Sequence, residues 1–171
     1  MSGGSITFVL GGSRSGKSSF ALSRASKLAG SKAFIATAQA FDEEMKDRIE
    51  RHKSERPAEW KTFEEPLSVP KLIADAGGRY GVVLVDCLTL WLSNLLMNGT
   101  DVEEEIESLL LSVAPCPSSL FIVSNEVGMG IVPDNALARR FRDMAGTLNR
   151  CIAEVADDVF LVVAGIPVKI K

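Results

Sequence analysis

A chain of 171 residues with a formal net charge of −3 is long enough to bury its own core without disulfides or a structural metal. Its charged residues are spread along the sequence, so no basic face predicts a nucleic-acid partner. Three cysteines without a CxxC pair and a single histidine argue against a disulfide scaffold or a zinc site and favour a reducing cytoplasm. The N-terminus lacks a signal-peptide pattern, and polar residues interrupt the most apolar stretch, 82–97. We therefore expect a soluble protein without a membrane span, organised as one domain over residues 1–171.

The first half of the chain alternates short apolar runs with helical patterns. The apolar runs are continuous, which is typical of strands buried on both faces of a sheet. The helical patterns end at breakers such as Pro57 and the pair Gly77–Gly78. In chain order we predict a strand at 6–10, a helix that carries Phe20, Leu22 and Leu28, a strand at 33–36, a helix from about Asp42, its N-cap, to Arg56, a short segment at 60–63, a helix at 67–76 and a strand at 82–85.

The second half continues the alternation. Asp101 and Glu104 have the spacing of a capping box at the start of one helix. Next in order, we predict a helix at 88–97, a helix that starts near Asp101, a strand at 120–123, a glycine-rich loop at 125–130, an amphipathic helix from about 135 to 155, a strand at 159–163 and a short edge strand at 168–170. Such alternation predicts an α/β fold with a mainly parallel sheet and helices on both faces.

The turn after the first strand matches Gly, four variable residues, Gly, Lys and then Ser or Thr. Its backbone N–H groups would form a cradle for phosphate oxygens at the positive end of the next helix. We expect Lys17 to reach the outer phosphates of a nucleoside triphosphate and the Ser18 hydroxyl to ligate its Mg²⁺. A surface turn that happens to contain a lysine is the alternative, but the strand before and the helix after favour a P-loop NTPase-like fold. The loop comprises Gly11, Gly12, Ser13, Arg14, Ser15, Gly16, Lys17 and Ser18.

Asp86 and His52 are the other candidates for chemistry. Asp86 follows the strand at 82–85, where a carboxylate can bind Mg²⁺ directly or through water; its alternative role is to cap the next helix. His52 shares a helical face with Met45 and Ile49, so it should face the protein body or a cleft. Two interpretations of His52 stay open: a packed histidine bonded to the backbone, which helical position alone favours, and a neutral imidazole nucleophile that attacks phosphorus.

Other charged residues have a structural and a functional interpretation each. Four cations surround His52 and are balanced by nearby carboxylates: Arg48, Arg51, Lys53 and Arg56, with Glu44, Glu50 and Glu55. We expect most of these cations to lie on a solvated helix face and one or two to neutralise phosphate charge. Glu64 and Glu65 fit either a turn before Pro66 or acceptors for a base or sugar. Solvent exposure or a subunit contact is expected for Glu126, Arg139, Arg140 and Arg142.

Several motifs occur in a fixed order along nearly the whole chain, from Ile6 to Lys171. They are Gly11 to Ser18, Thr37-Ala38-Gln39, Asp42-Glu43-Glu44-Met45, Arg48-Ile49, His52, Trp60, Asp86-Cys87-Leu88-Thr89, the segment 125–133 and Phe141-Arg142-Asp143. Together they resemble the bifunctional adenosylcobinamide kinase/adenosylcobinamide-phosphate guanylyltransferase family of cobalamin biosynthesis. The phosphate-binding loop is shared by many proteins, whereas the segments around His52 and at 125–133 are much more specific.

The resemblance implies two reactions. ATP or GTP phosphorylates the aminopropanol hydroxyl of adenosylcobinamide; a histidine then attacks the α-phosphorus of GTP, releases pyrophosphate and passes GMP to adenosylcobinamide phosphate, giving adenosylcobinamide-GDP. By motif, His52 would be the guanylylated nucleophile. Besides the loop, the resemblance implies nucleotide contacts by Thr37, Ala38, Gln39, Lys53, Ser54, Glu55, Arg56, Glu64 and Asp86, and a homo-oligomer with a trimer as the expected form. The alternatives are a P-loop kinase of another small metabolite with a structural His52, and a nucleotide-regulated binding module.

Overall fold

The computed structural model describes residues 4–40, 43–54 and 56–171. Its strands are β1 (Ile6–Gly11), β2 (Lys32–Ala36), β3 (Trp60–Glu64), β4 (Val82–Asp86), β5 (Ser119–Asn125), β6 (Asp158–Val163) and β7 (Ile166–Lys169). Its helices are α1 (Lys17–Ser26), α2 (Glu43–Ser54), α3 (Val69–Gly77), α4 (Leu88–Asn98), α5 (Val102–Val113) and α6 (Ala136–Val155). The expected alternation of strands and helices is therefore confirmed.

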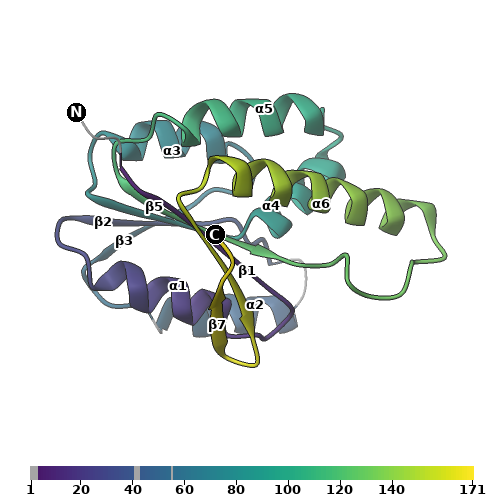
Figure 1. The fold of residues 1–171 in the computed structure, drawn as a ribbon, viewed down its shortest axis with the longest axis horizontal. Helices are drawn as coiled ribbons and strands as arrows, with labels where there is room; N and C mark the ends of the chain where they lie inside the picture. Colours follow the sequence, from purple (N-terminus) through teal and green to yellow (C-terminus); the bar gives the residue numbers. More distant parts are fainter. Residues whose placement is uncertain (1–3, 41–42, 55) are drawn as a thin grey trace.

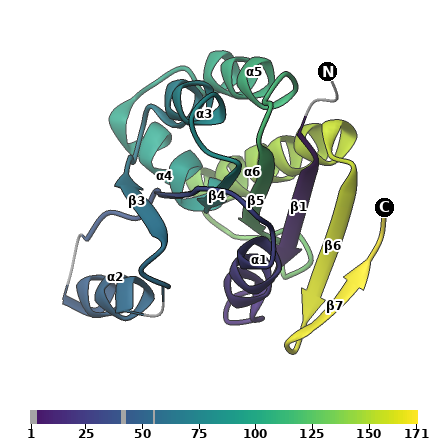
Figure 2. The ribbon, with the colours of Figure 1, turned by 90° about the vertical axis from the view of Figure 1, so that its left-hand side faces the viewer.

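The strands form one sheet in the order β3-β2-β4-β5-β1-β6-β7. All neighbouring strands are parallel except β6 and β7, which form an antiparallel hairpin. Helices α1 and α2 lie on one side of the sheet, and α3, α4, α5 and α6 lie on the other (Figures 1 and 2). The prediction of a mainly parallel sheet with helices on both faces is confirmed. Within the described ranges, no helix is long and apolar enough to cross a bilayer.

Continuous apolar runs form the central strands because both faces of the sheet are covered. Successive residues of β1 point to opposite faces, so Phe8 packs under α3 to α6 whereas Val9 packs against the small residues Ala21 and Ala25 of α1. Trp91 of α4 is fully buried in the larger of the two clusters. Each large side chain buried in this way stabilises the fold by about 1.5–3 kcal/mol relative to exposure. The packing fixes the strand ends from which the site is built.

Three local details differ from the sequence expectation. The segment at 60–63 is the edge strand β3, paired with β2. Helix α3 begins at Val69, two residues late, because the N–H groups of residues 67 and 68 donate to the Glu65 carboxylate instead. The last strand is 166–169 rather than 168–170, because Ala164 and Gly165 adopt positive φ and turn the chain at once.

Helix capping was predicted at two places. The Asp101 side chain accepts a hydrogen bond from the Glu104 N–H at 3.2 Å, which confirms it as the cap of α5. The predicted cap Asp42 lies outside the described residues.

Candidate functional site

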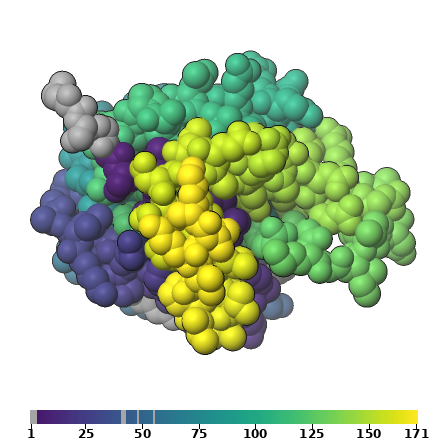
Figure 3. Space-filling view, in the orientation of Figure 1, coloured from purple at the N-terminus to yellow at the C-terminus, as the bar shows by residue number. Residues whose placement is uncertain are grey.

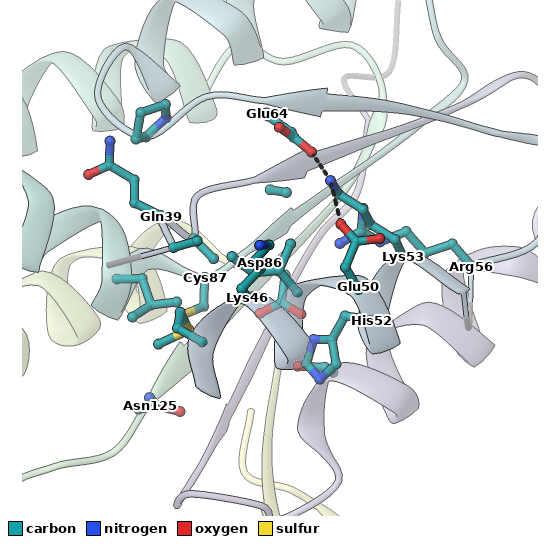
Figure 4. A pocket seen from close by; sticks show the side chains of 18 of the residues that line it. Gln39, Lys46, Glu50, His52, Lys53, Arg56, Glu64, Asp86, Cys87 and Asn125 are labelled. Atoms are coloured by element: carbon teal, nitrogen blue, oxygen red, sulfur yellow. Dashed lines mark hydrogen bonds and ion pairs between the residues drawn. The ribbon is translucent and has the colours of Figure 1, made fainter. Parts of the chain in front are cut away.

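A cavity of about 640 Å³ opens at the carboxyl ends of the central strands, between them and α2 (Figure 4). This is the edge where parallel α/β sheets bind ligands. A second hollow of about 450 Å³ lies between the glycine loop and α2. Lys17, Ser18 and His52 line both spaces. The two hollows therefore share the residues expected to bind phosphate and the histidine expected to act as nucleophile.

The glycine loop connects β1 to α1 and is held by its own backbone and by a distant turn. The Ser15 N–H donates to Gly12 O at 3.3 Å, and the Gly165 N–H of the β6–β7 turn donates to Ser15 O at 2.8 Å. Gly16, with φ of 90°, is the N-cap of α1 and adopts a conformation that favours glycine. The loop thus places the N-terminus of α1 at the cavity, where unpaired N–H groups attract anions.

Lys17 is only 7% exposed and donates from Nζ to the Gly12 carbonyl at 3.0 Å, so its ammonium is folded back over the loop. Ser18 follows it and is half-buried. A buried cation beside the N-terminus of a helix is suited to the outer phosphates of a nucleotide. The other loop residues share this edge: Ser13 lines the larger cavity, and Arg14, Ser15 and Gly16 line the second hollow.

Asp86 ends β4 and is half-buried at the wall of the same cavity as Ser18. The N-cap position of α4 belongs to Cys87, so the alternative that Asp86 caps this helix is wrong. Oxygen donors of this type, one hydroxyl and one carboxylate, suit Mg²⁺ that arrives with phosphates. Within the described ranges, no group of three or more His, Cys, Asp and Glu side chains could form a separate metal centre. The donor set fits a nucleotide-borne Mg²⁺.

Thr37, Ala38 and Gln39 follow β2, but their side chains have different surroundings. Ala38 and Gln39 line the cavity. Thr37 is completely buried, and its hydroxyl donates to Cys87 O at 2.7 Å and accepts from Cys87 N at 2.9 Å. Thr37 therefore joins the ends of β2 and β4, and its side chain is not at the cavity surface.

His52 lies near the C-terminal end of α2 and is half-exposed. Its ring is visible at the wall of the cavity in Figure 4. Among the described residues, none donates a hydrogen bond to the ring or accepts one from it. The structure therefore does not support the interpretation of His52 as a packed histidine bonded to the backbone. The ring is open to both hollows.

The cations after His52 are placed by specific contacts. Lys53 Nζ lies 2.6 Å from Glu64 and 3.4 Å from Glu50, and the hydrogen bond to Glu64 raises the pKa of Lys53 (Figure 4). The Arg56 guanidinium lies over the Phe34 ring at 3.8 Å and donates to Thr62 Oγ1 at 3.4 Å. Burial lowers the pKa of Arg56, although the charges of Asp86 and Glu64 act in the opposite direction.

Arg56 remains charged despite this shift, because a guanidinium starts from so high a pKa. Its Nε is buried and has no hydrogen-bond partner in the described part of the chain. Arg56 lines the cavity, so a ligand there can contact its guanidinium. Ser54 instead donates to Arg51 O and does not line either hollow, and Glu55 lies outside the described residues, as does the side chain of Arg48.

The ambiguous acidic and basic residues mostly serve local structure. The Glu65 carboxylate accepts from the N–H groups of Leu67 and Ser68, which confirms the turn before Pro66. Glu126 accepts from the Gly128 N–H within its own loop. Arg139 donates to the carbonyls of Pro133 and Asp134 and so ties this loop to α6. Glu64 differs from these residues, because it lines the cavity and pairs with Lys53.

Cys87 and Asn125 are among the cavity residues that had no role assigned from the sequence. Cys87 is buried at the N-cap of α4, and burial raises the pKa of its thiol to about 12, so it is an unreactive thiol at neutral pH. Asn125 lines the cavity from the end of β5. The available signal was its place directly after an apolar strand, the same signal that identified Asp86.

Comparison with known proteins gives consistent results. The sequence model of the cobinamide kinase / cobinamide phosphate guanyltransferase family matches residues 7–170. The chain is 44% identical over 165 residues to the bifunctional adenosylcobalamin biosynthesis protein CobP of Pseudomonas aeruginosa, with 95% of each chain covered. It is 42% identical to the proteins named CobU of Escherichia coli and Salmonella typhimurium, with 97% of this chain and 99% of each relative covered.

A solved structure of a prototypical ATPase from the type III secretion system of pathogenic bacteria superposes with a TM-score of 0.57 at 11% identity. The match covers 96% of this chain but only 56% of that ATPase, and at this identity it shows the fold alone. The P-loop NTPase-like fold class is thereby confirmed. With the family match over residues 7–170 and three relatives above 40% identity, this chain belongs to the cobinamide kinase / cobinamide phosphate guanyltransferase family.

Proposed function

We propose that this chain catalyses two successive transfers in cobalamin biosynthesis. In the first, ATP or GTP phosphorylates adenosylcobinamide. In the second, GMP passes from GTP through His52 to adenosylcobinamide phosphate, which gives adenosylcobinamide-GDP. Family membership supports both reactions. The observation that carries the proposal is the position of His52, whose ring borders both hollows and shares them with Lys17 and Ser18.

The glycine loop and Lys17 would bind the phosphate chain in both reactions. Phosphoryl and nucleotidyl transfer require positioning and charge neutralisation more than covalent chemistry from the protein. Arg14 and Arg51 line the hollow beside Lys17 and add positive charge there, against the two carboxylates of Glu44 and Asp47 that also line it. Ser18 and Asp86 would hold a Mg²⁺ ion, which withdraws charge from the phosphate oxygens when bound. On the other side of the cavity, Arg56 and Glu64 are the groups available to the nucleoside.

His52 would act as the nucleophile of the second reaction. A neutral imidazole nitrogen forms a bond to the α-phosphorus of GTP while the bond from that phosphorus to the α,β-bridging oxygen breaks, and pyrophosphate leaves with the electron pair. A phosphate oxygen of adenosylcobinamide phosphate then forms a new bond to the same phosphorus as the P–N bond breaks. The imidazole is regenerated. A ring open to two hollows suits a group that receives GMP from one substrate and gives it to another.

The test uses GTP labelled on the α-phosphate. Wild-type protein should retain an acid-labile label on His52, and His52→Ala should retain none while still phosphorylating adenosylcobinamide. His52→Asn keeps a polar side chain of similar shape and separates loss of the nucleophile from loss of packing. If wild-type protein turns over without ever carrying the label, the proposed guanylyl-His52 intermediate is wrong. Phosphorylation of another small metabolite, with adenosylcobinamide refused, would favour the alternative kinase.

We further propose that residues 1–171 act as one catalytic domain that assembles into a homo-oligomer, a trimer by family resemblance, in a reducing cytoplasm. Exposed apolar side chains support assembly: Val163, Ile166, Val168 and Ile170 on the β6–β7 hairpin, and Met129, Ile131, Val132 and Leu137 around the loop before α6. Figure 3 shows the hairpin lying across the surface, with the loop before α6 projecting beside it. The three free thiols agree with a reducing compartment. Light scattering would give the mass, and a monomer at working concentration would contradict the assembly.

A further inference from the structure

Asn125 lies between the two parts of the phosphate site. It ends β5, and β5 lies between β1 and β4 in the sheet. In the strand register, Asn125 is opposite Gly11 of the glycine loop, and Val123 is opposite Asp86. Parallel strands end at the same edge, so Asn125 stands between the loop and the Asp86 carboxylate. Figure 4 shows it on the opposite side of Asp86 from the pair Lys53–Glu64.

The backbone around Asn125 is fixed by hydrogen bonds from three elements. Its N–H donates to Thr89 Oγ1 of α4 at 2.7 Å, and its carbonyl accepts from Asn149 Nδ2 of α6 at 3.0 Å. The next N–H, of Glu126, donates to Gly11 O at 3.0 Å. Thr89 and Asn149 are themselves buried. At this strand end the bonds use only backbone atoms of Asn125 and Glu126, so the strand end is held without help from the Asn125 side chain.

The side-chain oxygen of Asn125 lacks a hydrogen-bond donor among the described residues. Its Oδ1 is buried and accepts no hydrogen bond from any residue in ranges 4–40, 43–54 and 56–171. A buried carbonyl oxygen without a donor costs about 1–3 kcal/mol. The side chain as a whole is only half-buried and lines the cavity, so a turn of its amide brings Oδ1 to a ligand there that supplies the missing donor. A fully ionised phosphate has no hydrogen to give, so the phosphate chain does not supply this donor, whereas a substrate hydroxyl can.

The position of Asn125 selects which hydroxyl. Lys17, which lines the same cavity, is the residue that reaches the outer phosphates in this loop type. A group beside Lys17 and Asp86 therefore faces the terminal phosphate and whatever attacks it, whereas the nucleoside hydroxyls belong to the other end of the triphosphate. We propose that Asn125 Oδ1 accepts the hydrogen bond of the acceptor hydroxyl and so positions it for phosphoryl transfer. This inference rests on the kinase half of the proposed function.

The step balances without an acid–base role for Asn125. The hydroxyl oxygen forms a bond to the γ-phosphorus as the bond to the β,γ-bridging oxygen breaks, the nucleoside diphosphate leaves with the electron pair, and the hydroxyl proton passes to solvent water. A neutral amide takes up no proton, so its contribution is orientation of the attacking oxygen. Formation of guanylyl-His52 involves no acceptor hydroxyl and should not need Asn125.

The experiment compares two ligands on two proteins. Wild type and Asn125→Ala are titrated with adenosylcobinamide and with an analogue whose terminal hydroxyl is replaced by hydrogen, both in the presence of a non-hydrolysable ATP analogue. Wild type should bind the hydroxyl ligand about fivefold to tenfold more tightly than the deoxy ligand, as expected for one hydrogen bond, and Asn125→Ala should bind both equally. In turnover, Asn125→Ala should lower kcat of phosphorylation about 10–100-fold with KM for ATP unchanged.

Labelling of His52 by GTP is the internal control and should match wild type in Asn125→Ala. Asn98→Ala removes an exposed amide from α4 and should change neither reaction. If Asn125→Ala does not fold, Asn125→Ser gives the same comparison with a smaller change. An undiminished preference for the hydroxyl ligand in the variant, or equal losses in phosphorylation and in His52 labelling, would overturn the inference while leaving the proposed function intact. A wild-type protein that cannot phosphorylate adenosylcobinamide would overturn both.

Discussion

The two sides of the cavity are built in different ways. On the sheet side, Asp86 ends β4, Asn125 ends the adjacent strand β5, and the glycine loop after β1 leads to Lys17 at the start of α1. Their places are set by strand register and buried packing. On the helix side, His52 and Lys53 come from α2, which lies beside β3 at one end of the sheet and is rich in exposed charges (Figure 2). The difference agrees with the proposed roles, because a phosphate-binding group would be fixed in advance, whereas a nucleophile that serves two substrates would need open access.

The largest effect should come from the fixed cation of the sheet side. Lys17→Ala should lower both phosphorylation and His52 labelling about 10²–10³-fold, because the proposed function assigns one buried charge to the phosphates in both reactions. Radiochemical assays of the two half-reactions would measure this. Lys27→Ala removes an exposed lysine just after α1 and is the matched control. Loss of one reaction with the other intact would break the comparison, because it would assign the two triphosphates to different sites.

A steric test of the sheet side should have the next largest effect. A Cβ at Gly11 would lie 2.8 Å from the Val162 carbonyl oxygen and would also clash with Ser15 Oγ. Gly11→Ala should therefore lower the free energy of unfolding by about 1–3 kcal/mol, measured by urea denaturation. Gly146→Ala, on the exposed face of α6 with open space around it, should instead raise stability by about 0.5–1 kcal/mol. If Gly11→Ala left the free energy of unfolding unchanged, the loop would be less firmly packed than the strand ends.

The buried thiol of Cys87 makes the stability of the sheet side depend on alkaline pH. An unfolded thiol ionises near its ordinary pKa of 9.0, whereas burial holds the folded pKa at about 12. Between these values the unfolded state binds fewer protons, so stability falls as pH rises, at most by about 1.4 kcal/mol per pH unit. Urea titrations across this window should give a shallower decline for Cys87→Ala than for wild type. Equal slopes would contradict the shift.

The smallest effect is expected on the helix side. Lys53→Met removes the pairs with Glu64 and Glu50, but all three side chains are more than one-third exposed, so the free energy of unfolding should change by less than about 1 kcal/mol. Thermal denaturation at low and high salt would measure it, with Lys46→Met as a control at another exposed pair. A loss greater than that of Gly11→Ala would reverse the comparison of the two sides.

The sequence predicted those features that depend on local pattern. Continuous apolar runs located the central strands, and the loop motif located Lys17 because both signals are contained in a few neighbouring residues. The strand β3 was harder to predict, since most of its residues are partly exposed and no apolar run marks it. The hairpin strand β7 contains Pro167, which an edge strand tolerates because one of its sides lacks a partner.

Site residues whose environment is set by distant contacts could not be placed in advance. The Thr37 hydroxyl is occupied by Cys87, which lies 50 residues further along the chain. Asn125 acquires its place only because β5 inserts between β1 and β4, which no local pattern indicates. The helical face of His52 was informative, since Met45 and Ile49 line the cavity with it.

The hydrogen bond from the Gly165 N–H to the Ser15 carbonyl joins the glycine loop to the β6–β7 turn. The ribosome synthesises the loop early and the turn about 150 residues later. β1 has the same dependence, because its partners are β5 and β6. A nascent chain therefore carries the complete loop motif long before it has the neighbours that shape it. Triphosphate binding should appear on the ribosome only after the hairpin has emerged, so an unfinished polypeptide would not sequester nucleotide.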